Sequence, residues 1–274
     1  MFEDISKVVL VTDMDGTLLN SKKEITPKDR AAIERFMELG GKFTVATGRT
    51  IQSFSAFYEL LDLKFPVIMF NGSIIYDKAS EKVLYSETLP DAAREYTMQI
   101  MSEMSDIGGE VLKTYETFVF CNNEYEKRHT EICKVTPVYS AIEDIPRDDW
   151  QKVLFAMAPE KVTEMMKFVS TKNYEGVCFV KSADIFFEMI KEGITKGSAL
   201  KKYRELDDFK GYTFVAAGDY NKDIEMLIEA DLGAAPANAQ PEVKAAADIV
   251  LKSTCDEGVI AELIDVIIQK CKIG

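Results

Sequence analysis

The sequence predicts an α/β protein whose doubly wound core is interrupted by a smaller inserted domain of α+β type. Buried-strand patterns alternate with helical patterns in both terminal parts of the chain, and the middle part follows a different pattern. The 274 residues allow one large domain or two modest ones, and the 47% hydrophobic content is enough for a sizeable core.

Short apolar runs bounded by turn residues recur along both terminal parts of the chain. Their β-branched and aromatic residues are typical of fully buried parallel strands. The predicted strands are Val8–Thr12, Phe43–Ala46, Val67–Phe70, Thr213–Ala217, Leu232–Ala235 and Ile249–Leu251. Helical patterns lie between them, at Pro27–Leu39, Ile51–Leu61, Ile224–Glu229 and Gly258–Lys270. Strands that alternate with helices in this way indicate a doubly wound, Rossmann-like parallel sheet.

The middle of the chain differs because its runs look amphipathic rather than buried on both faces. Such runs, together with two helical patterns, indicate an α+β domain with an antiparallel sheet. The expected strands are Thr117–Cys121, Lys152–Ala158, Gly176–Lys181 and Ile185–Ile190, and the expected helices are Asp91–Met104 and Pro159–Thr171. We therefore predict a core of residues 1–84 and 189–274 and an inserted domain of residues 85–188.

The charge balance excludes several classes of partner. The formal net charge is −13, from 33 Lys and Arg against 46 Asp and Glu, and no basic stripe offsets it. Such a chain is repelled by nucleic acid and by anionic lipid surfaces, so neither is expected as a partner. No apolar stretch approaches the roughly 20 residues of a membrane span, and the N-terminus lacks a signal-peptide pattern. The expected location is the cytoplasm.

The cysteine and histidine content narrows the chemistry. The five cysteines contain no Cys-x-x-Cys pair, so neither a zinc site nor a disulfide framework is predicted. His129 is the one histidine, which argues against Ser–His and Cys–His nucleophiles and against multi-histidine metal sites. Acid–base chemistry must therefore be done by carboxylates.

The most informative segment is Asp13-Met14-Asp15-Gly16-Thr17, directly after the first predicted strand. Ligands of open α/β sheets bind beyond the carboxyl ends of the strands, so both carboxylates are expected to face one crevice. Gly16 permits a tight turn whose backbone N–H groups can face an anion. An ordinary Asp-rich turn has the same pattern, so this segment does not decide the function alone.

Three further polar segments fall at the same type of position. Thr47-Gly48-Arg49 and Asp219 each follow a predicted strand, Asp223 closes the second of these loops, and Lys196 precedes a helical pattern. Each has an ordinary alternative, such as a helix N-cap or a solvated charge. Their shared placement instead predicts one crevice lined by a hydroxyl, an ammonium and about four carboxylates.

Four carboxylates in one crevice stay ionised only if positive charge balances them. Lys196 and Arg49 do not suffice for this. A hard divalent cation that prefers oxygen ligands, such as Mg²⁺, completes the balance and also binds a phosphoryl oxygen. The predicted cofactor is therefore Mg²⁺, and the predicted chemistry is phosphoryl transfer.

These segments together resemble a known family. Asp13–Thr17, Thr47–Arg49, Lys196 and Gly218–Leu227 are similar, in this order, to the four motifs of the haloacid dehalogenase-like superfamily. Two further segments resemble its Cof-type branch, namely Asn71–Asp77 and the carboxyl-terminal stretch from Ala237 to Val259. The resemblance covers residues 5–90 and 186–262, and the centre matches only as a cap of suitable length.

The resemblance implies a role for each motif residue. Asp13 would attack phosphorus, Asp15 would protonate the leaving alcohol and then activate water, and Thr47 and Lys196 would hold the phosphoryl oxygens. Mg²⁺ would be held by the Asp13 carboxylate, the Asp15 backbone carbonyl and Asp219, with Asp223 close by, directly or through water. The residues expected to line the phosphate and substrate pocket are Met14, Gly16, Thr17, Gly48, Arg49, Asn71, Gly72 and Asn238.

One position departs from the family pattern. Lys222 stands where the family usually has Asn before the second acid of the last motif. Lys222 either faces solvent or adds positive charge near the acids.

The resemblance implies an Mg²⁺-dependent phosphatase of a small phosphorylated metabolite, acting through an aspartyl phosphate under a cap domain. Sugar phosphates are the leading substrates, followed by nucleotides and pyridoxal phosphate. A phosphomutase that uses the same aspartates and a non-catalytic sensor of phosphorylated ligands remain alternatives. The sequence leaves open whether the protein is a monomer or a homodimer.

Overall fold

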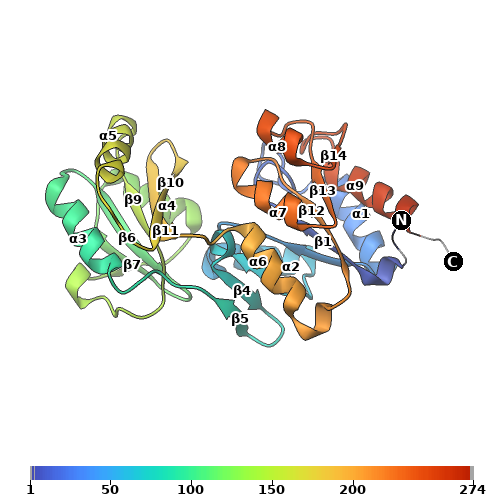
Figure 1. The fold of residues 1–274 in the computed structure, drawn as a ribbon, viewed down its shortest axis with the longest axis horizontal. Helices are drawn as coiled ribbons and strands as arrows, with labels where there is room; N and C mark the ends of the chain where they lie inside the picture. The colour runs from blue at the N-terminus through green and yellow to red at the C-terminus, as the bar shows by residue number, and fades with distance from the viewer. Residues whose placement is uncertain (1, 3, 272–274) are drawn as a thin grey trace. The chain divides into compact units, whose positions relative to one another are not determined.

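The computed structural model describes residue 2 and residues 4–271. The ends of the predicted core, residues 1, 3 and 272–274, lie outside the described residues. The chain divides into two compact units, traced in Figure 1. The first, here called the core unit, comprises Met1–Gly48, Phe57–Ser86 and Thr195–Gly274; the second, the inserted unit, comprises Arg49–Ala56 and Glu87–Ile194.

The core unit is built on a parallel sheet with the strand order β14-β13-β12-β1-β2. All residues of β1, Val8–Thr12, are buried because the sequence Val-Val-Leu-Val-Thr is suited to cover on both faces. The other strands are β2 Lys42–Val45, β12 Thr213–Ala217, β13 Leu232–Ala235 and β14 Ile249–Val250. Since β1 lies between β12 and β2, the loops that follow β1 and β12 emerge side by side.

A smaller antiparallel sheet, with the order β3-β4-β5, continues from the edge of the core sheet. Ala46 and Ile68 form a parallel bridge that connects the segment after β2 to β3, Val67–Met69. The other two strands are β4 Ile74–Asp77 and β5 Lys82–Ser86. Neither is among the predicted strands, and β5 alternates between exposed and half-buried residues because one of its faces is solvated.

Helices cover both faces of the core sheet (Figure 1). On one face, Val9 and Val11 of β1 pack with Leu200 and Tyr203 of α6. On the other, α1 and α9 pack together, and the Asp29 carboxylate accepts a hydrogen bond from the Ala261 N–H at 2.8 Å. The helices are α1 Pro27–Glu38, α2 Ile51–Leu61, α6 Lys196–Glu205, α7 Ile224–Glu229, α8 Pro241–Ala246 and α9 Val259–Lys270. The boundary between the units falls within α2.

The inserted unit holds a six-stranded sheet with the order β10-β11-β9-β6-β7-β8, mostly antiparallel. One apolar cluster joins its β6, β9 and β11 to α3 and α5. The strands are β6 Gly108–Lys113, β7 Thr117–Cys121, β8 Val138–Tyr139, β9 Trp150–Ala156, β10 Val177–Ala183 and β11 Phe186–Lys191. The helices are α3 Ala93–Glu103, α4 Glu124–Cys133 and α5 Pro159–Ser170. The predicted fold class, a doubly wound core with an inserted α+β domain, is confirmed.

One expectation for the inserted unit is wrong. Lys152–Ala158 looked like a strand with one solvated face, but every residue of β9 is buried. Val153 and Phe155 belong to the cluster under α3 and α5, whereas α4 contacts β6 and β9 as well. The strand is therefore covered on both faces, and the second cover is a helix that the sequence did not predict.

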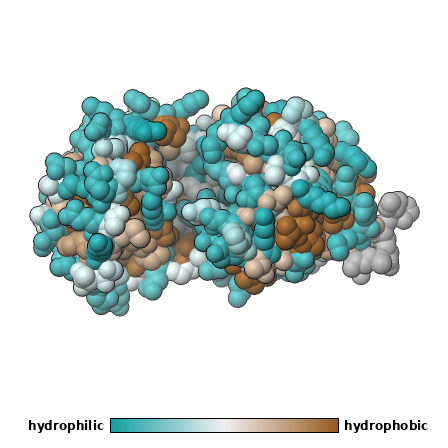
Figure 2. Space-filling view, turned by 90° about the horizontal axis from the view of Figure 1, so that it is seen from above, coloured by the Kyte–Doolittle hydropathy of each residue, from teal (hydrophilic) through white to brown (hydrophobic). Residues whose placement is uncertain are grey.

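Hydrophilic side chains cover most of the face drawn in Figure 2, and hydrophobic ones form smaller patches on it. Among the described residues, no helix combines the length and the apolar content that crossing a bilayer requires.

Candidate active site

The candidate site lies at the carboxyl ends of β1 and β12. The Asp13 N–H donates to the Ala217 carbonyl at 2.8 Å, so the pairing of the two strands continues one residue past β1. This bond places Asp13, a residue that is only 1% exposed, beside the loop that follows β12. The two loops that the sequence expected to meet are thus adjacent in the core unit.

Lys196 brings positive charge to this point. Its ammonium forms ion pairs with Oδ1 of Asp13 and with Oδ1 of Asp223, the latter at 2.6 Å, and all three side chains are almost fully buried. Lys196 is the first residue of α6, whose N-terminus is fixed by a capping box between Thr195 and Ser198. The local Thr-x-x-Ser sequence therefore sets where the ammonium enters the site.

Asp219 is held by the segment that follows Asp13. The Thr17 hydroxyl donates a hydrogen bond to Asp219 Oδ1 at 2.7 Å. Gly16 adopts a φ of +89°, and a Cβ at this position would stand 2.5 Å from Asp219 Oδ2. Glycine is therefore required at position 16 both for the turn and for the close approach of the carboxylate.

Asp223 organises the second loop rather than pointing freely into the site. Its Oδ2 accepts hydrogen bonds from the backbone N–H groups of Asp219 and Tyr220, at 3.2 and 3.0 Å. Its Oδ1 faces Lys196. Asp223 thus connects the ammonium to the loop that carries Asp219.

The acidic groups fit a hard divalent cation. One carboxylate oxygen from each of Asp13, Asp219 and Asp223 lies within 4.8 Å of the other two. The buried Oδ2 of Asp13 has no hydrogen-bond partner among the described residues, so it is available to a ligand. Carboxylate oxygens at this spacing are donors that divalent cations such as Mg²⁺ accept.

The electrostatics also indicate a need for positive charge. Burial raises the pKa of Asp13, and Asp223 adds to this effect, against the opposing charge of Lys196. Burial, followed by the charges of Asp13 and Asp223, raises the pKa of Asp219 to about 6, although the Thr17 hydrogen bond opposes the rise. A bound cation would stabilise both carboxylates in the ionised form that their burial disfavours.

Lys222 acts on this cluster from the surface. Its side chain is exposed, yet its charge lowers the pKa of both Asp13 and Asp219. The two alternatives left open by the sequence therefore both hold, because an exposed ammonium still adds positive charge near the acids.

Asp15 lies apart from the three clustered carboxylates. Its side chain is 36% exposed and forms an ion pair with Lys23 at 2.9 Å. The structure thus places Asp13 in a buried environment and Asp15 in a partly solvated one. Sequence reasoning missed Lys23, since no spacing rule marks it.

The remaining expected pocket residues of the core unit contact one another or the start of α6. Thr47 is buried, and its carbonyl accepts from the Asn71 N–H at 3.0 Å. A Cβ on Gly48 would stand 2.7 Å from Asn71 Oδ1. A Cβ on Gly72 would overlap the Thr195 carbonyl, so Gly72 lets the chain pass directly beside the start of α6. These contacts bring the second motif, the Asn-Gly segment and Lys196 together.

Three further residues were expected to line the pocket, and the structure places each of them differently. Met14 is fully buried, and its carbonyl accepts from the Leu19 N–H at 2.7 Å. Asn238 is exposed, and its side-chain amide donates to the Gly16 carbonyl at 2.7 Å, which ties down the loop after Asp13. Arg49 belongs to the inserted unit.

Comparisons with known proteins identify the family of the chain. The family model of the haloacid dehalogenase-like hydrolases matches residues 10–263. A pyridoxal phosphate phosphatase of Escherichia coli (strain K12) is 27% identical over 258 residues, which cover 89% of this chain and 92% of the relative. A 5-amino-6-(5-phospho-D-ribitylamino)uracil phosphatase of Bacillus subtilis (strain 168) is 28% identical over 261 residues, 94% of each chain.

A solved structure from the same family has a similar fold. A crystal structure of a haloacid dehalogenase-like hydrolase from Bacteroides thetaiotaomicron superimposes with a TM-score of 0.82 at 25% identity, covering 94% of this chain and 98% of that one. The chain therefore belongs to the haloacid dehalogenase-like hydrolase family. Within that family it is a phosphatase.

Proposed function

We propose that the protein is a Mg²⁺-dependent phosphatase of a small phosphorylated metabolite and that Asp13 carries the phosphoryl group between its two half-reactions. The observation that supports this most is the environment of Asp13. One of its carboxylate oxygens faces the Lys196 ammonium, and the other is buried without a partner among the described residues. A carboxylate oriented in this way is prepared for nucleophilic attack.

In the first half-reaction, a carboxylate oxygen of Asp13 attacks phosphorus while the bond from phosphorus to the substrate oxygen breaks. Asp15 gives its proton to the departing alkoxide, and its partial exposure leaves it accessible to that oxygen. Lys196 and Thr47 hold phosphoryl oxygens. In the second half-reaction, Asp15 takes a proton from water, which attacks the same phosphorus, so that phosphate leaves and the Asp13 carboxylate is restored.

Asp13, the Asp15 carbonyl, Asp219 and Asp223 would hold Mg²⁺, which neutralises charge on the phosphoryl oxygens when bound. The protein itself provides the scaffold for this. Thr17 orients Asp219, and Asp223 fixes the loop through two backbone N–H groups. Because the chain has a net charge of −13, attraction of an anionic substrate must come from such local groups.

The substrates we propose are small phosphorylated metabolites, with sugar phosphates first among them, and the names of two relatives support the wider class. One of them is a pyridoxal phosphate phosphatase, and another acts on a phosphorylated ribityl compound. We further propose that the protein acts in the cytoplasm, without a nucleic acid or membrane partner.

Hydrolysis of p-nitrophenyl phosphate tests the proposal first. We expect activity with Mg²⁺, loss of activity with excess EDTA, and loss in Asp13→Asn. A panel of sugar phosphates, pyridoxal phosphate, nucleotides and phosphorylated ribityl compounds then ranks the substrates by kcat/KM. A folded protein that hydrolyses none of these, but transfers phosphate when a sugar bisphosphate is added, would instead be a phosphomutase.

A further inference from the structure

A short turn of residues 236–240 contacts both loops of the candidate active site. It follows β13, which lies beside β12 in the parallel sheet, so the chain leaves β13 next to the loop that carries Asp219. The Ala239 N–H closes the turn by donating to the Pro236 carbonyl at 3.0 Å. The sequence of the turn is Pro-Ala-Asn-Ala-Gln, so it supplies no ionisable group and no hydroxyl to the proposed chemistry. Its contacts point to another role.

Asn238 joins the 236–240 turn to the loop that follows Asp13. Its side-chain N–H₂ group donates to the Gly16 carbonyl at 2.7 Å, and its side-chain oxygen accepts from the Cys255 N–H at 2.9 Å. A flipped amide would face each backbone group with the wrong partner, a donor against the N–H and an oxygen against the carbonyl. The two bonds therefore fix the direction of the side chain, although the residue is exposed.

Gln240 joins the same turn to the loop that follows β12. Its backbone N–H donates to the Asp219 carbonyl at 3.0 Å. The start of that loop is also bonded to β13, since the Gly218 N–H donates to the Ala234 carbonyl at 3.3 Å. One short turn thus bonds to the backbone of both loops that carry the candidate metal ligands.

The bond to Gly16 matters because glycine has more backbone freedom than any other residue. Gly16 adopts a φ of +89° and has no room for a Cβ beside the Asp219 carboxylate. Its neighbours are Asp15, whose backbone carbonyl is a proposed metal ligand, and Thr17, whose hydroxyl donates to Asp219 Oδ1 at 2.7 Å. A change in the Gly16 backbone would therefore move both the Asp15 carbonyl and the hydroxyl that orients Asp219. Asn238 opposes such a change because it holds the Gly16 carbonyl.

We propose that the 236–240 turn clamps the two loops at the spacing that the divalent cation requires, and that Asn238 is a positioning residue for the metal ligands. This inference rests on the metal site of the proposed function. Groups that fix the orientation of metal ligands typically account for about 10- to 100-fold in metal affinity. Asn238 acts through the backbone of Gly16 and is not itself a proposed ligand of the cation or of the phosphoryl group.

The test is Mn²⁺ binding to the folded full-length protein without substrate, measured from the electron paramagnetic resonance signal of the free ion. Mn²⁺ prefers the same carboxylate, carbonyl and water oxygens as Mg²⁺. We expect binding that Asp219→Asn abolishes, and a Kd that Asn238→Ala raises about tenfold. An unchanged Kd in Asn238→Ala would overturn the inference and leave the metal site standing. Absence of Asp219-dependent binding in the wild type would overturn the metal site and the inference with it.

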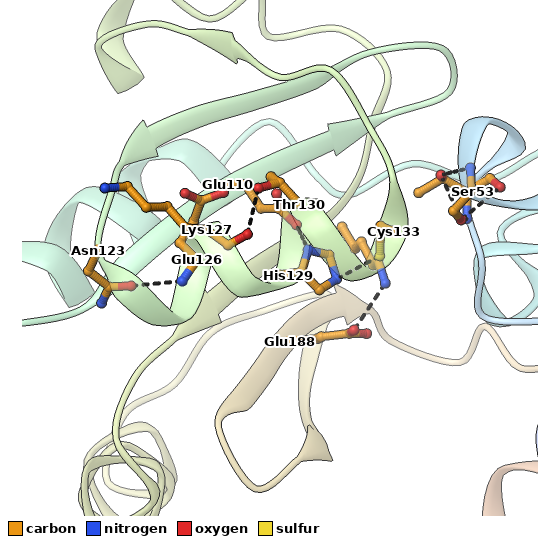
Figure 3. A network of polar contacts seen from close by, with 11 residues as sticks. Ser53, Glu110, Asn123, Glu126, Lys127, His129, Thr130, Cys133 and Glu188 are labelled. Carbon is orange, nitrogen blue, oxygen red and sulfur yellow. Dashed lines mark hydrogen bonds and ion pairs between the residues drawn. The ribbon is translucent and has the colours of Figure 1, made fainter. Parts of the chain in front are cut away.

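Asn123 of the inserted unit provides a matched control. Its side-chain oxygen accepts from the Glu126 N–H at 2.8 Å (Figure 3), and its amide donates to the Ala156 carbonyl at 3.0 Å, so it also bridges two backbone groups. Asn123 is the N-cap of α4, and loss of such a cap destabilises a helix. Asn123→Ala should therefore lower the urea midpoint of unfolding and leave the Kd for Mn²⁺ unchanged. An equal rise of the Kd in both Asn variants would show that general loss of stability is the cause, against the proposal.

The contact with the second loop is tested through the backbone. Gln240 has a φ of −61°, an angle that proline adopts, so Gln240→Pro removes the N–H that bonds to Asp219 without changing this angle. Gln240→Ala removes the same side chain and keeps the N–H. We expect a weaker Kd for Mn²⁺ in Gln240→Pro than in Gln240→Ala, and equal values in the two folded variants would overturn the clamp. If circular dichroism shows that Gln240→Pro does not fold, the comparison of Asn238→Ala with Asn123→Ala decides, and if Asn238→Ala does not fold, the Gln240 pair decides.

Discussion

The ammonium of Lys196 lies 2.6 Å from Oδ1 of Asp223, and neither side chain is exposed. The other oxygen of Asp223 accepts the backbone N–H groups of Asp219 and Tyr220. Because Lys196 also pairs with Asp13, one buried ammonium joins the proposed nucleophile to the loop that carries Asp219. The charge of Lys196 therefore supports both the fold and the chemistry of the site.

Removal of that charge should destabilise the core unit. Lys196→Met leaves two buried carboxylates without their cation, and such losses are typically about 3–5 kcal/mol of unfolding free energy. The variant should also lose hydrolysis, since no ammonium holds the phosphoryl group. Urea unfolding in EDTA and kcat/KM with Mg²⁺ measure the two effects. Lys201→Met, an exposed change on the same helix, serves as control, and equal stability of both variants would contradict this account.

Stability should require glycine at position 72 because the Thr195 carbonyl lies against it, and not only because its φ is positive. Gly72 and Gly211 both have positive φ, +114° and +78°, but only Gly72 lies against the Thr195 carbonyl, and nothing lies within 4 Å of a Cβ on Gly211. We expect Gly72→Ala to lose about 1–3 kcal/mol more stability than Gly211→Ala, as for other overpacked sites. It should also lower kcat, because Lys196 follows Thr195. Similar losses of stability in both variants would show that the contact with Thr195 does not affect stability.

The sequence predicts those strands and helices whose buried side chains are apolar. β1 was predicted because Val8–Thr12 is apolar on both faces of the strand. α4 was missed because its buried face consists of Glu126 and His129, and no hydrophobic pattern marks such a helix. The solvated face expected for β9 was wrong for the same reason, since α4 covers it.

The candidate site was likewise predicted only in part from the sequence. The rule that ligands bind at the carboxyl ends of parallel strands places Asp13 near Asp219 from the sequence alone. It does not give side-chain partners, so the contacts of Asp223 with Lys196 and of Asp15 with Lys23 emerge only from the structure. The single histidine argued against a Cys–His arrangement, yet the helical spacing places Cys133 beside it.

Lys222 should weaken metal binding. Its exposed ammonium lowers the pKa of Asp13 and Asp219, and the same charge repels a cation bound between them. Lys222→Asn is therefore expected to lower the Mg²⁺ concentration for half-maximal activity about two- to fivefold, with a smaller effect at high salt. Lys201→Gln is a control of equal charge change. An unchanged or higher Mg²⁺ requirement at low ionic strength would exclude this effect.

Glu126 should make the stability of the inserted unit depend on pH. Its pKa rises from 4.5 to about 7 on folding, so the folded state holds the proton more tightly than the unfolded state does. Its contribution is therefore most favourable below pH 4.5 and becomes unfavourable as the pH rises to 7. Glu126→Gln should match the wild type at pH 4.5 and exceed it at pH 8, by about 2–3 kcal/mol.

Urea unfolding at the two pH values measures this difference. His129, whose pKa is raised from 6.5 to about 10, acts in the higher window of pH 6.5–10 and is present in both proteins. Glu124→Gln, exposed in the first turn of α4, should show no pH-dependent gain. A constant difference between Glu126→Gln and the wild type across this range would refute the prediction.

The central claim is that Asp13 becomes phosphorylated during turnover. Acid quenching of the enzyme with Mg²⁺ and p-nitrophenyl phosphate, followed by hydroxylamine, converts an aspartyl phosphate into a hydroxamate that peptide mass spectrometry locates. We expect the hydroxamate at Asp13 during turnover, none with EDTA, and neither hydroxamate nor turnover in Asp13→Asn. Hydroxamate at Asp15, or full turnover in Asp13→Asn, would contradict the claim.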